Sequence, residues 1–457
     1  MFYAREKELK ELKDFINKPN QAAVVTGKRR IGKTTLIKEA LKGVDDFIYF
    51  ECLKDTIKEN INNITNNMQG IDISIPSFVQ FDSFITLFSY LNSLNKKMTI
   101  VLDEYPYLKI LNNANVVDSQ FQNIIDNHLS NINLILSGSS IKVMNELLNE
   151  SNPLYGRFKL IIHLKELNYL DSSSFYQEKS VYDKIAFYSI FGGSPYINEF
   201  INPKESLKDN IINLFLNETN GVYQYADKVL ISDATNEVQA KRILSALGNG
   251  KKKYSELEQL LDKEKSGKIY QSLKSLLELN IIKKTYPINR KTDIRKSYYE
   301  INDNALRFYY SYIYKNKSNL IMIGSNQFYK EFVEPSLITY ISHRFEDVVK
   351  NYYSILSHQG KLENVIDIGT YYYDDNVNKT NGEFDVVIKY NDDTIDIVEV
   401  KYFKEGNKLS TKEIEEELKQ INSMKFIPIK NVYFISTSGY EDNKYNCLDI
   451  NKIYSLN

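Results

Sequence analysis

The stretch from Ala22 to Leu41 reads AAVVTGKRRIGKTTLIKEAL. It begins with four apolar residues, 22–25, which predict a short buried strand. A loop bounded by Gly27 and Gly32 follows, and the apolar spacing over 33–41 predicts a helix. The amino end of a helix attracts anions because its backbone N–H groups are unpaired and its dipole is positive there. The stretch therefore predicts an α/β fold with an anion-binding turn between a strand and a helix.

Residues 27–34 match the pattern GxxxxGK[ST] at every fixed position. In this pattern the loop amides surround the phosphates of ATP, the lysine reaches the β- and γ-phosphates, and the hydroxyl binds magnesium. These roles fall to Lys33 and Thr34. The other residues expected to contact the nucleotide are Gly27, Lys28, Arg29, Arg30, Ile31, Gly32 and Thr35. A chance glycine-lysine turn is the alternative, and the flanking strand and helix weigh against it.

Two more apolar strands are predicted, over 98–102 and 133–136, and each ends in polar residues. Helical stretches separate the strands, which indicates a doubly wound parallel sheet with its chemistry at the carboxyl ends of the strands. After the first strand, Asp103 is expected to bind magnesium through water and Glu104 to orient or deprotonate the attacking water. The alternative is an acidic turn. The predicted cofactors are ATP and Mg²⁺.

Small hydroxyl residues follow the strand 133–136. Ser137, Ser139 or Ser140 is expected to sense the γ-phosphate through its hydroxyl, and all three are equally compatible with a simple turn. Further on, Arg157 ends the sharp turn 153–157, where an arginine can act in cis or in trans on the charge of the γ-phosphate. A surface arginine is the alternative.

Composition describes a multidomain globular chain of 457 residues with 42% hydrophobic and 26% charged residues. No stretch approaches the roughly 20 apolar residues of a membrane span, and the charged residues near Met1 do not suit a signal peptide. We therefore expect a cytoplasmic protein with no membrane partner. Two distant cysteines and four scattered histidines predict neither a disulfide framework nor a zinc site. The net charge of −1 argues against a uniformly basic surface that binds nucleic acid, although one domain can still carry a basic face.

The middle of the chain is predominantly helical. Residues 1–166 are predicted to form the ATPase core, 167–233 a helical lid with a turn at 192–195, and 234–315 a winged helix-turn-helix. The last prediction combines three helices, over 236–247, 254–261 and 266–279, with two strands, over 281–288 and 297–301. Basic residues gather on it: Lys251, Lys252, Lys253, Lys265, Lys268, Lys283, Lys284, Arg290, Lys291, Arg295 and Lys296. DNA is the predicted partner, and a protein partner is the alternative.

The remaining domain, 316–457, is predicted to be α/β, with helices over 345–356 and 412–423 and strands over 382–390, 394–402 and 431–436. Asp385 and Glu399 lie on neighbouring strands, and Glu399 and Lys401 point to one face because side chains alternate along a strand. We expect the two carboxylates to bind a divalent cation that activates water, and Glu346 to complete the metal shell. Lys401 is expected to orient the nucleophile or to stabilise the pentavalent phosphate. Gln420 on the following helix supports this interpretation, and a charged hairpin edge is the alternative.

These motifs together resemble the archaeal-type AAA+/STAND ATPases over nearly the whole chain. The resemblance includes the segment 2–9, FYAREKEL, and the turns at 153–157 and 192–195. It implies ATP binding and hydrolysis in a soluble prokaryotic protein. It also implies a C-terminal domain similar to the restriction-endonuclease-like PD-(D/E)xK nucleases, with Asp385, Glu399 and Lys401 as the matching residues. Here Phe384 replaces the proline of that motif.

The sequence therefore predicts a magnesium-dependent ATPase that controls a winged helix and a nuclease-like domain acting on DNA. Cleavage of DNA is an open part of this prediction. The alternative is a non-catalytic switch in which ATP changes oligomerisation, including formation of a homo-oligomer, or the choice of a protein partner. A kinase is disfavoured because Asp103 and Glu104 supply a base directed at water and no acceptor motif is present.

Overall fold

The computed structural model describes residues 4–66, 68, 75, 79–229, 234, 236–261, 266–375, 380–404, 406–424, 427–442 and 444–456. Phe2 and Tyr3 of the N-terminal segment and Lys265 of the predicted basic cluster lie outside these residues, as does the side chain of Lys268. The chain divides into two compact units, 1–166 and 167–457. None of the described helices is both long and apolar enough to cross a membrane.

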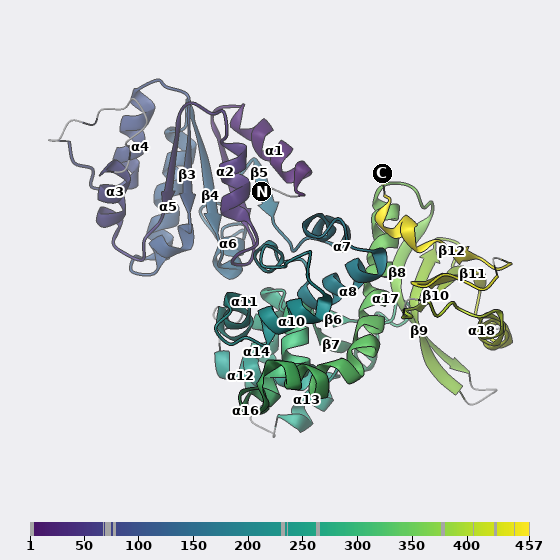
Figure 1. The fold of residues 1–457 in the computed structure, drawn as a ribbon. Helices are drawn as coiled ribbons and strands as arrows, with labels where there is room; N and C mark the ends of the chain where they lie inside the picture. The colour runs from purple at the N-terminus through teal and green to yellow at the C-terminus, as the bar shows by residue number, and fades with distance from the viewer. Residues whose placement is uncertain are drawn as a thin grey trace. The chain divides into compact units, whose positions relative to one another are not determined.

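The N-terminal unit is a parallel sheet with helices on both faces, as Figure 1 shows. Its strands are β1 (Gln21–Thr26), β2 (Phe47–Glu51), β3 (Met98–Asp103), β4 (Ile132–Gly138) and β5 (Leu160–His163), in the spatial order β2-β3-β4-β1-β5. Its helices are α1 (Glu6–Ile16), α2 (Lys33–Ala40), α3 (Ile57–Asn66), α4 (Phe84–Ser93), α5 (Ala114–Asn127) and α6 (Ile141–Glu146). All neighbouring strands pair in parallel.

Alternating side chains of β1 divide the core of this unit into two layers. Ala22 and Val24 pack with the cluster that contains residues of α3, α4 and α5. Ala23 and Val25 pack with the cluster that contains residues of α1 and α2. A strand covered on both faces is apolar along its whole length, which explains the continuous run from Ala22 to Val25. The sheet therefore holds the carboxyl end of β1 rigidly beneath the following loop.

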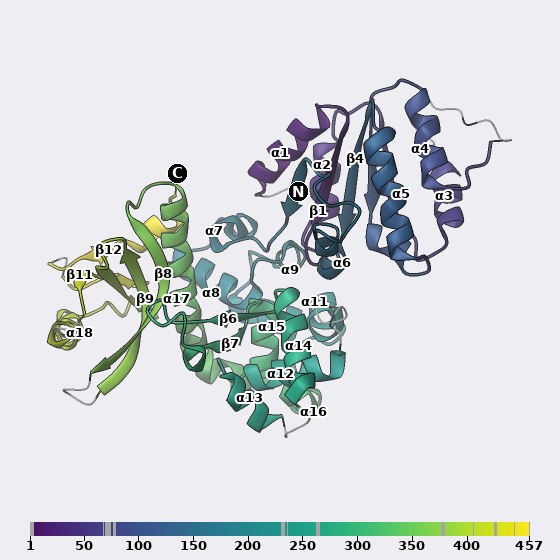
Figure 2. The same cartoon turned by 180° about the vertical axis from the view of Figure 1, so that it is seen from behind.

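The second unit begins with the short helices α7 (Tyr169–Ser172), α8 (Val181–Phe191), α9 (Pro195–Asn198), α10 (Leu207–Phe215) and α11 (Gly221–Gln224). Three helices and a two-stranded antiparallel sheet follow: α12 (Glu237–Leu247), α13 (Tyr254–Leu260), α14 (Ser266–Glu278), β6 (Ile282–Thr285) and β7 (Tyr298–Ile301). The helices α15 (Asn304–Phe308), α16 (Lys317–Phe328) and α17 (Glu334–His358) lead to the C-terminal sheet. Figure 2 shows the same unit from behind.

The C-terminal sheet is mixed and has the order β12-β11-β10-β9-β8. Its elements are β8 (Val365–Asp375), β9 (Thr380–Tyr390), β10 (Ile395–Lys401), α18 (Thr411–Ser423), β11 (Ile429–Ser436) and β12 (Cys447–Leu448). β9 pairs antiparallel with both β8 and β10, whereas β11 pairs parallel with both β10 and β12. Residues of α17 pack on one face, with Val386 and Val398. Residues of α18 pack on the other face, with Val387 and Ile397.

The predicted α/β class and its parallel P-loop sheet are confirmed. The strand predicted over 281–288 is shorter, because β6 ends at Thr285 before Pro287, which has no N–H to donate to a sheet. Four of the described strands were not identified from the sequence: β2, β5, β8 and β12. The predicted division of the chain into four domains stays a prediction.

Candidate functional site

The phosphate loop joins the carboxyl end of β1 to the amino end of α2. Gly27 allows a close approach, since a Cβ there would lie 2.6 Å from the Leu164 carbonyl oxygen. Gly32 has φ +96°, a left-handed conformation that glycine adopts without strain. The buried Lys33 ammonium donates hydrogen bonds of 2.9 and 3.0 Å to the carbonyl oxygens of Gly27 and Lys28. Its positive charge therefore lies at the centre of the loop.

Asp103 at the end of β3 faces the first turn of α2. The Thr34 hydroxyl donates a hydrogen bond of 2.7 Å to Asp103 Oδ2, and the hydroxyl of Tyr49 on the neighbouring strand β2 donates to the same oxygen. The Glu104 amide donates to Asp103 Oδ1 at 3.0 Å. Burial and the charge of Asp103 raise the pKa of Tyr49, so its phenol stays protonated. Three groups thus hold one carboxylate, of which Tyr49 was not identified from the sequence.

A magnesium ion fits the Thr34 and Asp103 pair. Mg²⁺ is bound by oxygen atoms and usually retains several waters, with one or two protein ligands and the phosphates completing its shell. The pair supplies a hydroxyl and a carboxylate oxygen that already lie 2.7 Å apart. A bound Mg²⁺ would draw charge from the phosphates, and Thr34 and Asp103 would hold it.

Glu104 follows β3 in a left-handed conformation, with φ 53° and ψ 41°. Its Oε2 accepts hydrogen bonds from the Ser139 hydroxyl at 2.8 Å and from the Ser139 amide at 3.2 Å. Ser137, in contrast, is fully buried, and its hydroxyl has no hydrogen-bond partner among the described residues. Of the serines predicted as sensors, Ser139 is therefore the one that contacts Glu104. A nucleotide contact by Ser137 stays a prediction.

Arg157 lies at the amino edge of the sheet. Its guanidinium binds Asp126 in the last turn of α5 through hydrogen bonds of 3.0 Å from Nε and from a terminal nitrogen. Lys159, two residues later, donates its amide to the carbonyl of Ala22 at the start of β1. The phosphate loop lies beyond the other end of β1. The length of the strands separates Arg157 from the loop of its own chain, and its action on the γ-phosphate, in cis or in trans, stays a prediction.

The loop also contains the basic residues predicted to contact ATP. Lys28 forms an ion pair of 2.9 Å with Glu166, which is part of the same unit. Arg30 is exposed and has φ 61°. Their contacts with nucleotide, like those of Arg29, Ile31 and Thr35, stay predictions.

A second set of predicted residues gathers where β9, β10 and α17 meet. Burial, followed by the charge of Glu346, raises the pKa of Asp385 to about 6. Burial, followed by the charge of Glu417, raises the pKa of Glu399 to about 7, with smaller contributions from Asp385 and Glu346. These effects act between carboxyls on α17, β9 and β10, and their role as one site stays a prediction.

The predicted metal shell stays a prediction. Within the described ranges, no three side chains of His, Cys, Asp or Glu are grouped closely enough to hold a metal ion. Glu346 instead accepts a contact of 3.3 Å from His343. Glu346, Asp385 and Glu399 come from α17, β9 and β10, and their binding of a metal ion stays a prediction.

Lys401 contacts an acidic residue of α18 that the sequence interpretation missed. Its ammonium donates a hydrogen bond of 2.8 Å to Glu417 and lies 3.8 Å from Glu399. Burial lowers the pKa of Lys401, but the bond to Glu417 and the charge of Glu399 outweigh it, so the pKa is raised overall. Gln420 is exposed, so the supporting role given to it passes to Glu417, nearly one turn earlier. The sequence TKEIEEE at 411–417 contains several glutamates, and nothing in it indicates which of them contacts Lys401.

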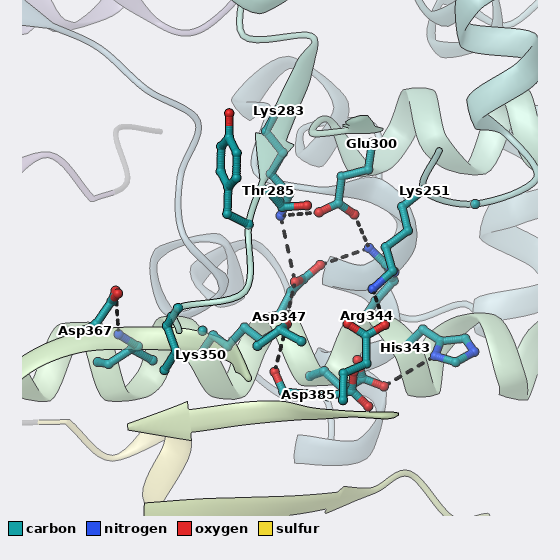
Figure 3. A pocket seen from close by; sticks show the side chains of 18 of the residues that line it. Lys251, Lys283, Thr285, Glu300, His343, Arg344, Asp347, Lys350, Asp367 and Asp385 are labelled. Atoms are coloured by element: carbon teal, nitrogen blue, oxygen red, sulfur yellow. Dashed lines mark hydrogen bonds and ion pairs between the residues drawn. The ribbon is translucent and has the colours of Figure 1, made fainter. Parts of the chain in front are cut away.

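A cavity of about 960 Å³ lies between the β6–β7 sheet, α17 and the strands β8 and β9, as Figure 3 shows. Asp385 and Glu346 contribute to its wall. The basic residues that line it are Lys251, Lys283, Lys291, Arg344 and Lys350. Several of them are paired with acids, and Lys283 for example lies 3.3 Å from Glu300. The acidic site therefore opens into a highly charged cavity.

The parallel sheet, the phosphate loop and the acidic pair at the end of β3 define a P-loop ATPase. Residues 2–199 match the family model described as an ATPase domain predominantly from Archaea. Residues 309–426 match a second model, described as archaeal and bacterial proteins of unknown function. The N-terminal part of the chain is thus an ATP-binding ATPase domain, as predicted.

The chain is 30% identical over 370 residues to the uncharacterized protein MJECL04 of Methanocaldococcus jannaschii. This match covers 79% of each chain. The chain belongs to the same family as that protein. Among solved structures, the Walker-type ATPase PABY2304 of Pyrococcus abyssi is similar, with a TM-score of 0.52 and 17% identity. This likeness covers 68% of the present chain and 96% of the Pyrococcus chain and shows a shared fold.

Proposed function

We propose that the protein hydrolyses ATP with magnesium and that its nucleotide state controls a C-terminal half that acts on DNA. The observation that carries the ATPase part is the contact of 2.7 Å between Thr34 and Asp103 beside the Lys33 ammonium. Phosphoryl transfer depends on positioning and on neutralising charge. These three side chains bring a cation, a hydroxyl and a carboxylate to one edge of the sheet.

Each residue has a defined task in this proposal. Lys33 and the loop amides bind the β- and γ-phosphates, and Thr34 and Asp103 hold magnesium. Glu104 accepts a proton from the attacking water, and Ser139 holds the Glu104 carboxylate in place. Arg157 serves a neighbouring copy of the chain in trans, since it lies at the edge of the sheet remote from its own loop.

ATP hydrolysis by wild type and by Lys33→Ala tests the ATPase. The expected result is magnesium-dependent release of phosphate by wild type and a loss of about 100-fold or more in Lys33→Ala. Lys42→Ala is the matched control. Lys42 is an exposed lysine just after the same helix, and it pairs with Glu39 in the last turn of that helix. Full hydrolysis by Lys33→Ala would refute the proposal.

The DNA part rests on the order of elements in 237–301. Three helices precede the β6–β7 hairpin, and a bridge between Lys252 and Tyr299 adds a further strand pairing. This order is typical of a winged helix, and the lysines on it can neutralise DNA phosphates. Binding of duplex DNA that weakens steeply with salt is expected. Binding of a protein partner in place of DNA is the alternative.

Cleavage of DNA is a second candidate function, favoured by the carboxyls of Asp385 and Glu399 beside Lys401. Incubation of DNA with wild type, Asp385→Ala and Lys401→Ala in the presence of divalent cations tests it. Loss of cleavage in both variants would support a nuclease. Equal behaviour of all three proteins would instead favour a C-terminal half that only binds.

A further inference from the structure

The connection between β6 and β7, residues 286–297, is docked on the edge of the C-terminal sheet. The Ile288 amide donates a hydrogen bond of 2.7 Å to the carbonyl of Thr370 on β8. Asn289 exchanges two hydrogen bonds with the backbone of Tyr372, of 2.7 and 3.1 Å. The Ile288 side chain is buried in the cluster that contains Phe384. This connection is called the wing below, and its backbone and the Asn289 side chain contact the backbone of the edge strand β8.

Two basic residues of the wing, and Lys251 just before α13, contact the same sheet. Lys291 lies 2.5 Å from Asp367 on β8, and Lys251 lies 2.7 Å from Glu383 on β9. Lys296 stacks over the ring of Tyr372, with its ammonium 3.6 Å from the ring centroid. Three of the positive groups predicted to meet DNA phosphates are therefore occupied by the C-terminal sheet.

A carboxylate and a phosphate compete for the same ammonium. Each ion pair seen here is partly exposed, so its own contribution to stability is small. The backbone bonds and the burial of Ile288 add to it and make the docking cooperative. Lys251, Lys291, Asp367 and Glu383 all line the cavity into which Asp385 opens. The docked wing thus forms one wall of the acidic site, while the ammonium groups of Lys251 and Lys291 are paired with carboxylates.

We infer that the C-terminal sheet masks the DNA-binding face of the wing, with Asp367 and Glu383 in the places that backbone phosphates take when DNA binds. Docking of the wing and binding of DNA by Lys251 and Lys291 then exclude each other. Release of the wing also opens the cavity beside Asp385. This inference rests on the proposed DNA function.

A variant with a released wing tests the inference. In Asp367→Asn with Glu383→Gln, both carboxylates lose their charge but keep their size. Duplex DNA of about 20 base pairs should bind this variant about tenfold more tightly than it binds wild type. The slope of log affinity against log salt should steepen by about 2, because two more lysines meet phosphates. The control, Asp393→Asn with Glu416→Gln, makes the same change of net charge at exposed positions of the same domain.

A locked variant gives the opposite test. Ile288→Cys with Gly369→Cys places two thiols together, since a Cβ at Gly369 would lie 2.7 Å from the Ile288 side chain. Oxidation should weaken DNA binding about tenfold, and reduction should restore it, which also shows that the variant is folded. Oxidised and reduced wild type control for Cys52 and Cys447.

Hydrogen exchange at the Ile288 amide reports docking without DNA. The inference is overturned if this amide loses protection in the released variant while DNA affinity stays at the level of the control. It is equally overturned if the disulfide lock leaves DNA affinity unchanged. If no variant binds DNA while the released amide exchanges rapidly, the proposed DNA function itself fails and the masking fails with it. The proposal of ATP hydrolysis does not depend on that outcome.

Discussion

Ser139 Oγ donates a hydrogen bond of 2.8 Å to Glu104 Oε2, which joins the ends of β3 and β4 across the edge of the sheet. The two residues are separated by 35 positions in the chain. A general base requires a fixed orientation towards the water it deprotonates, and an error of about 1 Å costs on the order of 100-fold in rate. In the proposed mechanism, Ser139 is therefore a positioning residue for Glu104.

Ser139→Ala should lower kcat for ATP hydrolysis about tenfold and leave nucleotide affinity within about twofold, because the hydroxyl acts on Glu104. Glu104→Gln should lower kcat about 100-fold or more with the same affinity. Steady-state hydrolysis and equilibrium binding of a fluorescent ATP analogue separate the two effects. Ser140→Ala is the control. A tenfold loss in that control, with Ser139→Ala unaffected, would show that Ser140 and not Ser139 positions Glu104.

Tyr49→Phe removes one of the hydrogen bonds to Asp103 without changing the shape of the side chain. The concentration of Mg²⁺ that gives half-maximal nucleotide binding should rise about fivefold, since Asp103 is then less well oriented towards the cation. Binding of ATP in the presence of a chelator should not change. Titration of Mg²⁺ at fixed nucleotide measures both. An equal loss with and without Mg²⁺ would show that Tyr49 is only a packing residue of β2.

Arg157→Ala should abolish most ATP hydrolysis although the arginine is remote from its own loop. Mixing Arg157→Ala with Lys33→Ala should then restore activity, because the first protein keeps an intact loop and the second an intact arginine. Activity of the mixture, measured against each variant alone over a range of protein concentrations, tests the action in trans. The prediction fails if Arg157→Ala alone hydrolyses ATP at the wild-type rate. Lys159→Ala is a control on the same segment.

Glu399→Gln should stabilise the protein at neutral pH. The folded pKa of Glu399 is about 7 and that of Asp385 about 6, both above their ordinary values of 4.5 and 3.8. Between pH of about 4 and 7 the folded protein holds more protons than the unfolded chain, so stability falls as pH rises through this window. Removal of the Glu399 charge should recover about 1–2 kcal/mol at pH 8 and little at pH 4.

Thermal unfolding at the two pH values checks this prediction. Glu416→Gln, an exposed change on α18, should shift the melting temperature equally at both. A similar gain for Glu399→Gln at pH 4 and pH 8 would indicate a packing effect and contradict the titration of this carboxyl.

Much of the N-terminal unit was predictable from local sequence. Eight consecutive residues, 27–34, carry both the conformation and the chemistry of the phosphate loop, so neighbours along the chain suffice to identify it. The continuous apolar run of β1 and the acidic pair after β3 are likewise local features. The choice of Ser139 over Ser137 was not predictable, because it depends on where β4 ends relative to β3.

The C-terminal half shows the opposite balance. Asp385, Glu399 and Lys401 were found because alternation along a strand is a property of consecutive residues. Glu417 was missed in favour of Gln420, since the rotation of α18 over the sheet is set by packing of Ile414 and Ile421. The basic wing looked free from its sequence, yet Lys291 meets Asp367 in the folded chain.

The chain alone was thus sufficient for the phosphate loop and the α/β class, because hydrogen-bonding patterns and side-chain periodicity extend over only a few residues. Folding was needed to bring Tyr49 to Asp103 and the wing to β8. Such pairs are far apart in the chain, and they form only when many weak contacts fix the register of strands and the positions of helices together.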